Sequence, residues 1–162
     1  MKKTITTVLM LVIAISSFAQ LKINKTVDEM TDKESYLTNE RFLATNPEKN
    51  KGCAIDMVID VVNNVKISNY MFVQMIGIES CNENNILIML FENGEKLSIK
   101  SWNKFNCKGN AYFSLSKENV NMLKTNILDK VRITNGYSHN SYTAEIDYKT
   151  YFIEFYKLLN QT

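Results

Sequence analysis

The chain has 162 residues, 19 of them basic and 17 acidic, and a formal charge of +2. Two of the basic residues, Lys2 and Lys3, begin a segment that we expect to be removed, which leaves 17 basic and 17 acidic side chains. A charge near zero gives no electrostatic attraction to a phosphate backbone, so we expect no nucleic-acid partner.

The first nineteen residues are typical of a secretory signal peptide. Lys2 and Lys3 precede an apolar run, Ile5 to Ile15, and Ser17-Phe18-Ala19 places small residues at positions −3 and −1 of a cleavage site. The run is about eleven residues long, well short of the roughly 20 that span a bilayer. We therefore expect cleavage after residue 19, export to the periplasm or the cell exterior, and no transmembrane segment in the cleaved chain.

Residues 20–162 are expected to form a single β-rich domain, because their length suits one hydrophobic core. Weak alternation from Thr26 to Thr38 predicts one or two short edge strands, and the polar stretch from Ala44 to Gly52 predicts a surface loop. From Cys53 to Val61 every second residue is apolar, while Asp56 and Asp60 fall on the opposite face. This pattern predicts a half-buried strand.

The apolar segments from Tyr70 to Ile78 and from Ile86 to Phe91 have the length and composition of strands. Glu92-Asn93-Gly94-Glu95 follows the second segment and predicts a two-residue type I′ hairpin. In that register one face is core, with Leu90 opposite Leu97 and Ile88 opposite Ile99. The other face is half apolar, because it holds Leu87, Met89 and Phe91 opposite Lys100, Ser98 and Lys96.

The last third of the chain adds two helices to further strands. Ala111 to Leu115 predicts a strand, and Ser116 is the expected N-cap of a helix over residues 117–126. After strands at 129–134 and 142–146, Asp147 is expected to cap a helix over 148–160, whose aromatic stripe covers the sheet. We predict an α+β fold, mainly antiparallel β, with β-sandwich-like sheets and two accessory helices. An open sheet with both helices on one face is the alternative.

Three cysteines in an exported chain raise the question of a disulfide. Continuing the predicted hairpin register outward places Cys81 opposite Asn106, one residue from Cys107, so we predict a Cys81–Cys107 disulfide. The alternative is that all three are small apolar residues in a reduced protein. Cys53, on the apolar face of its strand, is expected to be buried and inert.

The sequence contains few catalytic candidates. His139 is the single histidine, and it lies in a polar segment (134–141) that predicts a loop. The cysteines lack C-x-x-C spacing, so we expect no metal site. Asp56 and Asp60 would lie about 13 Å apart on a strand, too far for a glycosidase pair. No nucleophile elbow, phosphate loop or dinucleotide motif is present, so we expect no cofactor and favour a non-enzymatic role.

The best binding candidates lie at the end of the predicted hairpin. Lys96, Lys100, Lys104 and Lys108 recur every four residues, beside Trp102 and Phe105. Such lysines usually keep an edge strand soluble and unpaired, and they also suit an anionic surface. The candidate contact residues are Trp102, Phe105, Lys100 and Lys104, with Tyr137 and His139 on another loop as weaker candidates.

One resemblance extends over most of the cleaved chain. The segment Val27-Asp28-Glu29-Met30-Thr31-Asp32, the apolar strand series with its Asn-Gly hairpin and the closing aromatic helix resemble small secreted proteins of Bacteroidota bacteria. The Ser-Phe-Ala ending of the signal is similar to the export signals of those proteins. The resemblance implies export and a β-rich fold, and it transfers no functional residue.

These observations favour an exported, non-enzymatic binding or interaction module of a bacterial cell envelope. Its partner is expected to be an envelope protein or glycan. The alternative is a small secreted hydrolase whose site is assembled from separate loops, with His139 and an acidic partner.

Overall fold

The computed structural model describes residues 21–77, 85–103, 106, 108–135, 138–146 and 148–161, with the side chains of 134–146 outside this description. The expected signal peptide, 1–19, and both cysteines of the expected disulfide, Cys81 and Cys107, lie outside the described residues. The described part contains ten strands and two helices. The strands are β1 (Ile23–Asp28), β2 (Lys33–Thr38), β3 (Phe42–Thr45), β4 (Gly52–Val62), β5 (Val65–Ile76), β6 (Ile86–Phe91), β7 (Lys96–Lys100), β8 (Asn110–Ser114), β9 (Leu128–Asn135) and β10 (Ser138–Ile146), and the helices are α1 (Lys117–Thr125) and α2 (Tyr151–Leu159).

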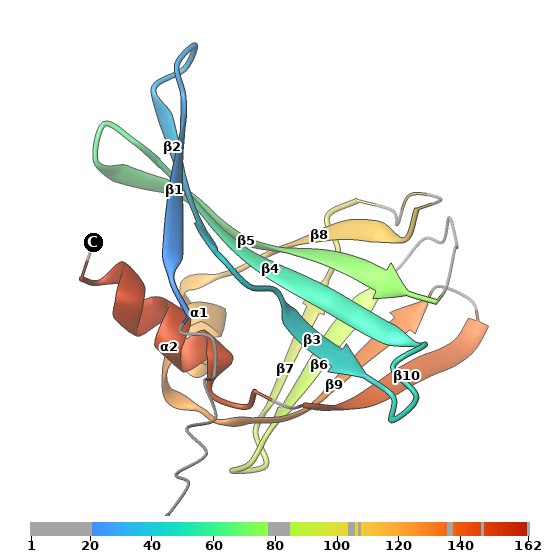
Figure 1. The fold of residues 1–162 in the computed structure, drawn as a ribbon. Coiled ribbons are helices and arrows are strands. Elements are labelled where there is room, and N and C mark those ends of the chain that lie inside the picture. Colours follow the sequence, from blue (N-terminus) through green and yellow to red (C-terminus); the bar gives the residue numbers. More distant parts are fainter. Residues whose placement is uncertain are drawn as a thin grey trace, which may run out of the picture.

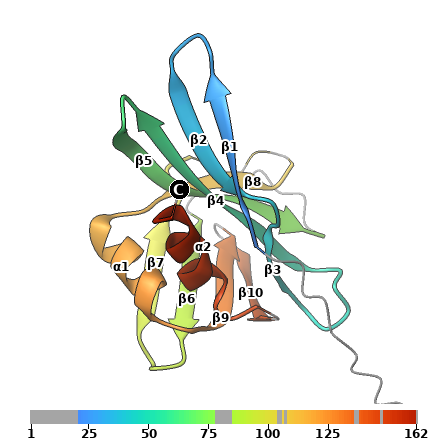
Figure 2. The ribbon, with the colours of Figure 1, turned by 60° about the vertical axis from the view of Figure 1, so that its left-hand side comes forward.

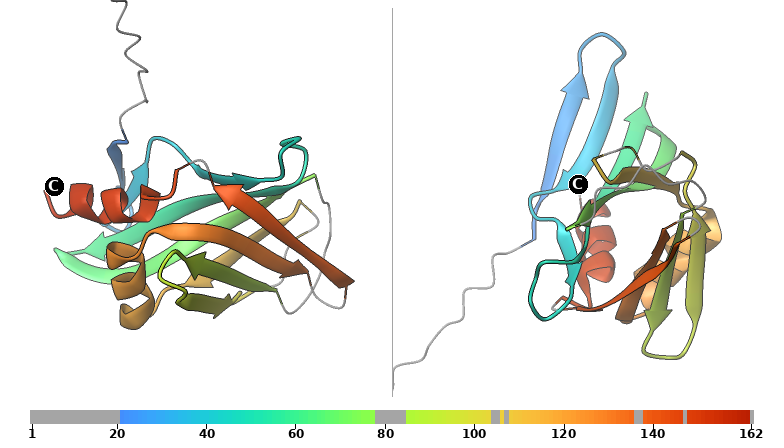
Figure 3. Two further views of the ribbon diagram at one scale, coloured as in Figure 1. Left: turned by 90° about the horizontal axis from the view of Figure 1, so that it is seen from below. Right: turned by 90° about the vertical axis from the view of Figure 1, so that its right-hand side faces the viewer.

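The strands form one antiparallel sheet that folds over itself into two layers (Figures 1 and 3). The first layer contains β1, β2, β4, β5 and β8, and the second contains β10, β9, β6 and β7. The short strand β3 joins the layers, since it pairs with β4 on one edge and with β10 on the other. Gly52 permits the close approach of β3 and β4, because a Cβ at this position would lie 2.1 Å from the carbonyl oxygen of Ala44.

Both helices lie at the same end of the molecule, side by side (Figure 2). Ser116 caps α1 as predicted, with its Oγ accepting a hydrogen bond from the backbone N–H of Asn119 at 3.1 Å. The aromatic stripe of α2 faces the core, where Phe42 of β3 packs against Tyr151 and Phe152 at centroid distances of 5.4 and 5.0 Å. One apolar cluster therefore includes residues of both layers and both helices.

The predicted fold class is confirmed, and the boundaries of two elements are corrected. Helix α2 begins at Tyr151 rather than at residue 148, and its N-cap is Thr150 rather than Asp147. The segment expected to be a loop, 134–141, instead belongs mostly to the β9–β10 hairpin. Within the described residues, no helix is both long and apolar enough to cross a membrane.

The predicted register of the β6–β7 hairpin is wrong by one residue. The backbone N–H of Phe91 donates to the carbonyl oxygen of Glu95 at 3.0 Å, so the loop has three residues, Glu92 to Gly94, and Gly94 adopts φ = +84°. Three-residue hairpins place a residue of positive φ at this position. Because side chains alternate along a strand, the slip exchanges the two faces. The core face holds Leu87, Met89 and Phe91 with Leu97 and Ile99, while Ile86, Ile88 and Leu90 point outward opposite Lys100, Ser98 and Lys96.

Candidate binding surface

Four aromatic side chains gather on the outer face of the first layer. Along β5 and β8 the inward residues are buried, while Tyr70, Phe72 and Tyr112 alternate with them and are only partly covered. Antiparallel pairing sets Phe72 opposite Tyr112, and Tyr70 lies two residues away on the same face. Trp102, from the segment after β7, completes the group. We call these four residues the aromatic surface.

The rings of the aromatic surface contact one another edge to face and at a tilt. Trp102 lies 5.7 Å from Tyr70 and 5.4 Å from Tyr112 between ring centroids, inclined by 33° and 34°. Tyr112 lies 5.2 Å from Phe72 and 5.8 Å from Tyr70. Separations of this size are favourable for aromatic pairs. The four rings therefore support one another in a continuous apolar surface.

Backbone hydrogen bonds hold the segment of Trp102 against β8. The backbone N–H of Trp102 donates to the carbonyl oxygen of Tyr112 at 3.0 Å, and the backbone N–H of Tyr112 donates to Oδ1 of Asn103 at 2.9 Å. These two bonds fix the backbone of the segment, and the ring contacts with Tyr70 and Tyr112 hold the indole, yet 60% of Trp102 stays exposed. A large aromatic residue that is both anchored and exposed is typical of a binding contact.

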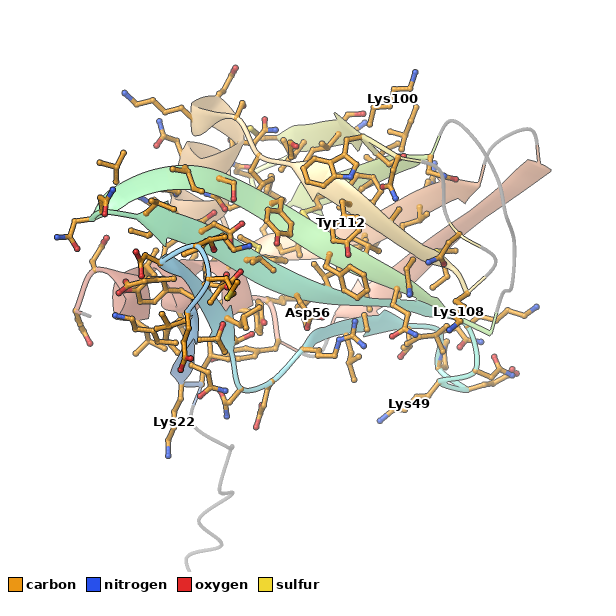
Figure 4. The ribbon with its side chains drawn as sticks, turned by 90° about the horizontal axis from the view of Figure 1, so that it is seen from above. Lys22, Lys49, Asp56, Lys100, Lys108 and Tyr112 are labelled. Atoms are coloured by element: carbon orange, nitrogen blue, oxygen red, sulfur yellow. The ribbon has the colours of Figure 1, made fainter. Side chains whose placement is uncertain are left out.

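A polar border runs along one side of the aromatic surface. Arg41 lies with its guanidinium carbon 5.8 Å from the ring centroid of Phe72. Its Nε donates to Oδ1 of Asp56 at 2.9 Å, and its Nη1 donates to Oε1 of Gln74 at 2.7 Å. Asp56 on β4 and Tyr112 on β8 flank strand β5 in the same layer (Figure 4). This border offers planar hydrogen-bonding groups with balanced charge.

The aspartates considered for catalysis are each engaged with different partners. Asp56 pairs with Arg41, whereas Asp60 is 7% exposed and accepts hydrogen bonds from Ser35 Oγ at 2.7 Å and Ser68 Oγ at 2.8 Å. Among the described residues, no group of three or more histidine, cysteine or acidic side chains is placed to hold a metal ion. Cys53 is buried, as expected, and burial raises the pKa of its thiol to about 12.

The sequence-predicted contact residues have different outcomes. Trp102 belongs to the aromatic surface, and Lys100 is exposed on β7, opposite Ile86. Phe105, Lys104 and Tyr137 lie outside the described residues, as does the side chain of His139, whose backbone is in β10. Tyr70, Phe72 and Tyr112 were missed, although their alternation with Met71, Val73, Ala111 and Phe113 along the two strands predicts that they face outward.

A second outer face results from the corrected hairpin register. Ile86, Ile88 and Leu90 form an outward row on β6, between cationic residues of β7 and β9. The row lies half-buried rather than exposed, and a hollow of about 240 Å³ runs beside it. Long basic side chains can cover apolar surface with their methylene stems while their charges stay in water. The hollow is lined by Ile88, Leu90, Lys96, Lys130, Val131 and Arg132.

Comparison of the chain with protein-family models, curated proteins and solved structures gives no match.

Proposed function

We propose that this protein is an exported binding module that holds a glycan of the bacterial envelope on its aromatic surface. The observation that carries the proposal is the exposure of Trp102, at 60%, while its ring contacts Tyr70 and Tyr112 and its backbone is bonded to β8. The ring contacts and the backbone bond distinguish Trp102 from a tryptophan that is merely exposed on a loop.

The chemistry of a sugar ring suits both parts of this surface. A pyranose presents a face of C–H groups, which favours the negative face of an aromatic ring, and aromatic residues supply this contact at low entropic cost. Its hydroxyl groups donate and accept hydrogen bonds, which guanidinium, carboxylate and carboxamide groups satisfy with planar geometry. Arg41, Asp56 and Gln74 supply these three groups beside Phe72.

The balance of charge around the surface favours a weakly charged ligand. The guanidinium of Arg41 is already neutralised by Asp56, so this border attracts neither polyanions nor polycations strongly. Burial, followed by the negative charge of Asp60, raises the pKa of Tyr70, which keeps its hydroxyl protonated and able to donate a hydrogen bond. An export signal is consistent with a glycan outside the cytoplasm.

Binding can be measured with the protein's single tryptophan as the probe. The cleaved protein is titrated with protease-treated envelope polysaccharide from the producing cells, and tryptophan fluorescence is recorded. We expect a saturable change, and we expect Trp102→Ala and Tyr112→Ala to weaken co-sedimentation with the polysaccharide about tenfold or more, as for central aromatic contacts elsewhere.

Met30→Ala provides the matched control, because Met30 is an apolar residue, 93% exposed, at the turn of the β1–β2 hairpin. The Met30→Ala variant should bind the polysaccharide as the wild type does. Equal binding by wild type and both aromatic variants would exclude the aromatic surface. Binding that disappears when the envelope fraction is protease-treated would exclude a glycan and identify a protein partner.

A further inference from the structure

A concave site, separate from the hollow beside β6, lies at the helical end of the molecule, between the first part of β5 and helix α1. Its volume is about 400 Å³. None of its residues belongs to the aromatic surface or to the polar border. The residues that line it are Lys66, Ile67, Ser68, Asn69, Leu115, Lys117, Val120, Asn121 and Lys124.

A β-bulge directs Lys66 to this site. The pairing of β4 with β5 shifts by one residue, so that Asp60 is opposite Ser68 while Val61 is opposite Lys66, leaving Ile67 unpaired. A bulge of this kind changes the face of the sheet on which the side chains beside it lie. Lys66 therefore shares the face of Val61, which packs against the core, rather than the outer face of Asp60. Without the bulge its charge would point away from α1.

Helix α1 contributes the other two cations. Lys117 is the first helical residue and Lys124 lies in the last turn. Lys124 is held by an aromatic contact, with its Nζ 5.1 Å from the ring centroid of the buried Tyr156. Tyr156 is in turn fixed by the amide of Asn69, whose Nδ2 donates to the tyrosine hydroxyl at 3.1 Å. The position of Lys124 is thus set by packing rather than by an acidic partner.

Three lysines share this concavity without a counter-charge. The lining contains no acidic residue, and in the described part of the chain none of the three forms an ion pair. Glu118, the acidic residue of the first turn of α1, is not among the lining residues. Burial and the positive charge of Lys124 lower the pKa of Lys66. All three lysines are exposed at the surface, so an anion can reach them, and its charge would favour their protonated form.

We propose that this concavity is a binding site for a phosphoryl group, with Lys66, Lys117 and Lys124 as its cationic contacts. Asn121 lines the same space and adds an amide group able to donate hydrogen bonds to phosphate oxygens, whereas the amide of Asn69 already bonds Tyr156. The site is independent of the glycan proposal, because the two surfaces share no residue.

The first test uses inorganic phosphate and the cleaved wild-type protein. Backbone and lysine side-chain NMR spectra are recorded at pH 7 during a phosphate titration, with chloride at matched ionic strength as the reference. We expect saturable shifts confined to the first part of β5 and to α1, together with an upward shift of the pKa of Lys66. The double variant Lys66→Gln/Lys124→Gln should bind phosphate about tenfold or more weakly, since charge-assisted contacts are lost.

Lys22→Gln is the matched control, because Lys22 is exposed, lies outside the site and forms no ion pair among the described residues. It should bind as wild type does. A second arm replaces phosphate with vesicles of phosphatidylcholine containing phosphatidic acid. Vesicle binding that the double variant loses supports the site and assigns the phosphoryl group to a lipid. Two NMR results count against the site: shifts that never saturate, and shifts that persist in a folded double variant. Either result, together with an absence of vesicle binding, would overturn the proposal.

Discussion

Among single residues, Cys53 links ionisation directly to folding. The residue is 3% exposed in β4, and burial raises the pKa of its thiol from 9.0 to about 12. In the unfolded chain the thiol ionises near its ordinary pKa, whereas in the folded protein it stays protonated. Between pH 9 and 12 the unfolded state therefore releases a proton that the folded state keeps. Stability contributed by the neutral thiol is complete below pH 9 and is lost as the pH rises through this window.

This difference predicts how the stability of the wild type changes with pH relative to Cys53→Ala. Above pH 9 the free energy of unfolding of the wild type should fall faster than that of the variant, by roughly 1.4 kcal/mol per pH unit. Urea denaturation with reductant at pH 8, 9 and 10 measures both slopes, and other titrating groups cancel in the comparison. Parallel slopes would show that Cys53 is accessible to water in the folded protein.

Individual residues also show what the sequence could predict about the candidate binding surface. Trp102 was found because a tryptophan in a polar segment is conspicuous. Tyr70, Phe72 and Tyr112 each look like ordinary strand residues, and they become a site only because β5 pairs with β8. The β6–β7 hairpin separates those strands in the chain, and no local signal records that they are neighbours. Pairing between distant strands is a tertiary property, so composition and alternation predicted the strands but not the surface.

At the level of elements, the β6–β7 hairpin depends on the conformation of Gly94. Its φ of +84° is disfavoured for residues with a Cβ, yet a Cβ there would meet no atom within 4 Å. Gly94→Ala should therefore destabilise the protein by about 1 kcal/mol through backbone strain alone. Gly94→Asn should cost less, because asparagine tolerates this region. Urea denaturation of the two variants tests whether alanine destabilises the protein more than asparagine does. The same difference is expected for a two-residue type I′ turn with Asn93 and Gly94 as its central residues.

The length of the loop between β6 and β7 is tested by the pairing of the two strands. In the three-residue loop, the backbone N–H of Phe91 donates to the carbonyl oxygen of Glu95 and the carbonyl oxygen of Phe91 accepts from Gly94 at 2.9 Å, while the backbone N–H of Glu92 donates to the carbonyl oxygen of Ile127 at 2.9 Å. NOE contacts between the Hα protons and amides of β6 and β7 identify the register directly. We expect contacts that pair Met89 with Leu97, and contacts that pair Leu90 with Leu97 would contradict the structure.

The error in the predicted register has a physical cause in β6. Strand β7 alternates strictly, so its buried residues, Leu97 and Ile99, were identified correctly. Strand β6 is apolar at all six positions from Ile86 to Phe91, and so its pattern fits either register equally well. The Asn-Gly pair is compatible with a two-residue or a three-residue loop. The structure resolves the choice by pairing β6 with β9 on its other edge, a contact that the turn sequence does not encode.

On the scale of the whole molecule, the two layers and the two helices share one apolar cluster. The fold class was predictable because strand-type segments outnumber helical ones and the two amphipathic helices come late in the chain. The linking role of β3 was not predictable, since four residues beside a polar loop carry little periodic signal. That short strand connects the layers, so the topology depends on pairings rather than on local propensity.

A shared core predicts that the two layers unfold together. Phe155 in α2 is fully buried, and Phe155→Ala should destabilise the protein by about 3–5 kcal/mol through lost contacts and a residual cavity. The single tryptophan, Trp102, reports on the outer face of the first layer, while far-UV circular dichroism reports on all strands and helices. Both signals should shift to the same lower urea midpoint in the variant, as cooperative unfolding requires. Lys157→Ala, exposed on the same helix, is the control and should leave both midpoints unchanged. A variant that loses circular dichroism while its tryptophan signal keeps the wild-type midpoint would show that the first layer folds independently of α2.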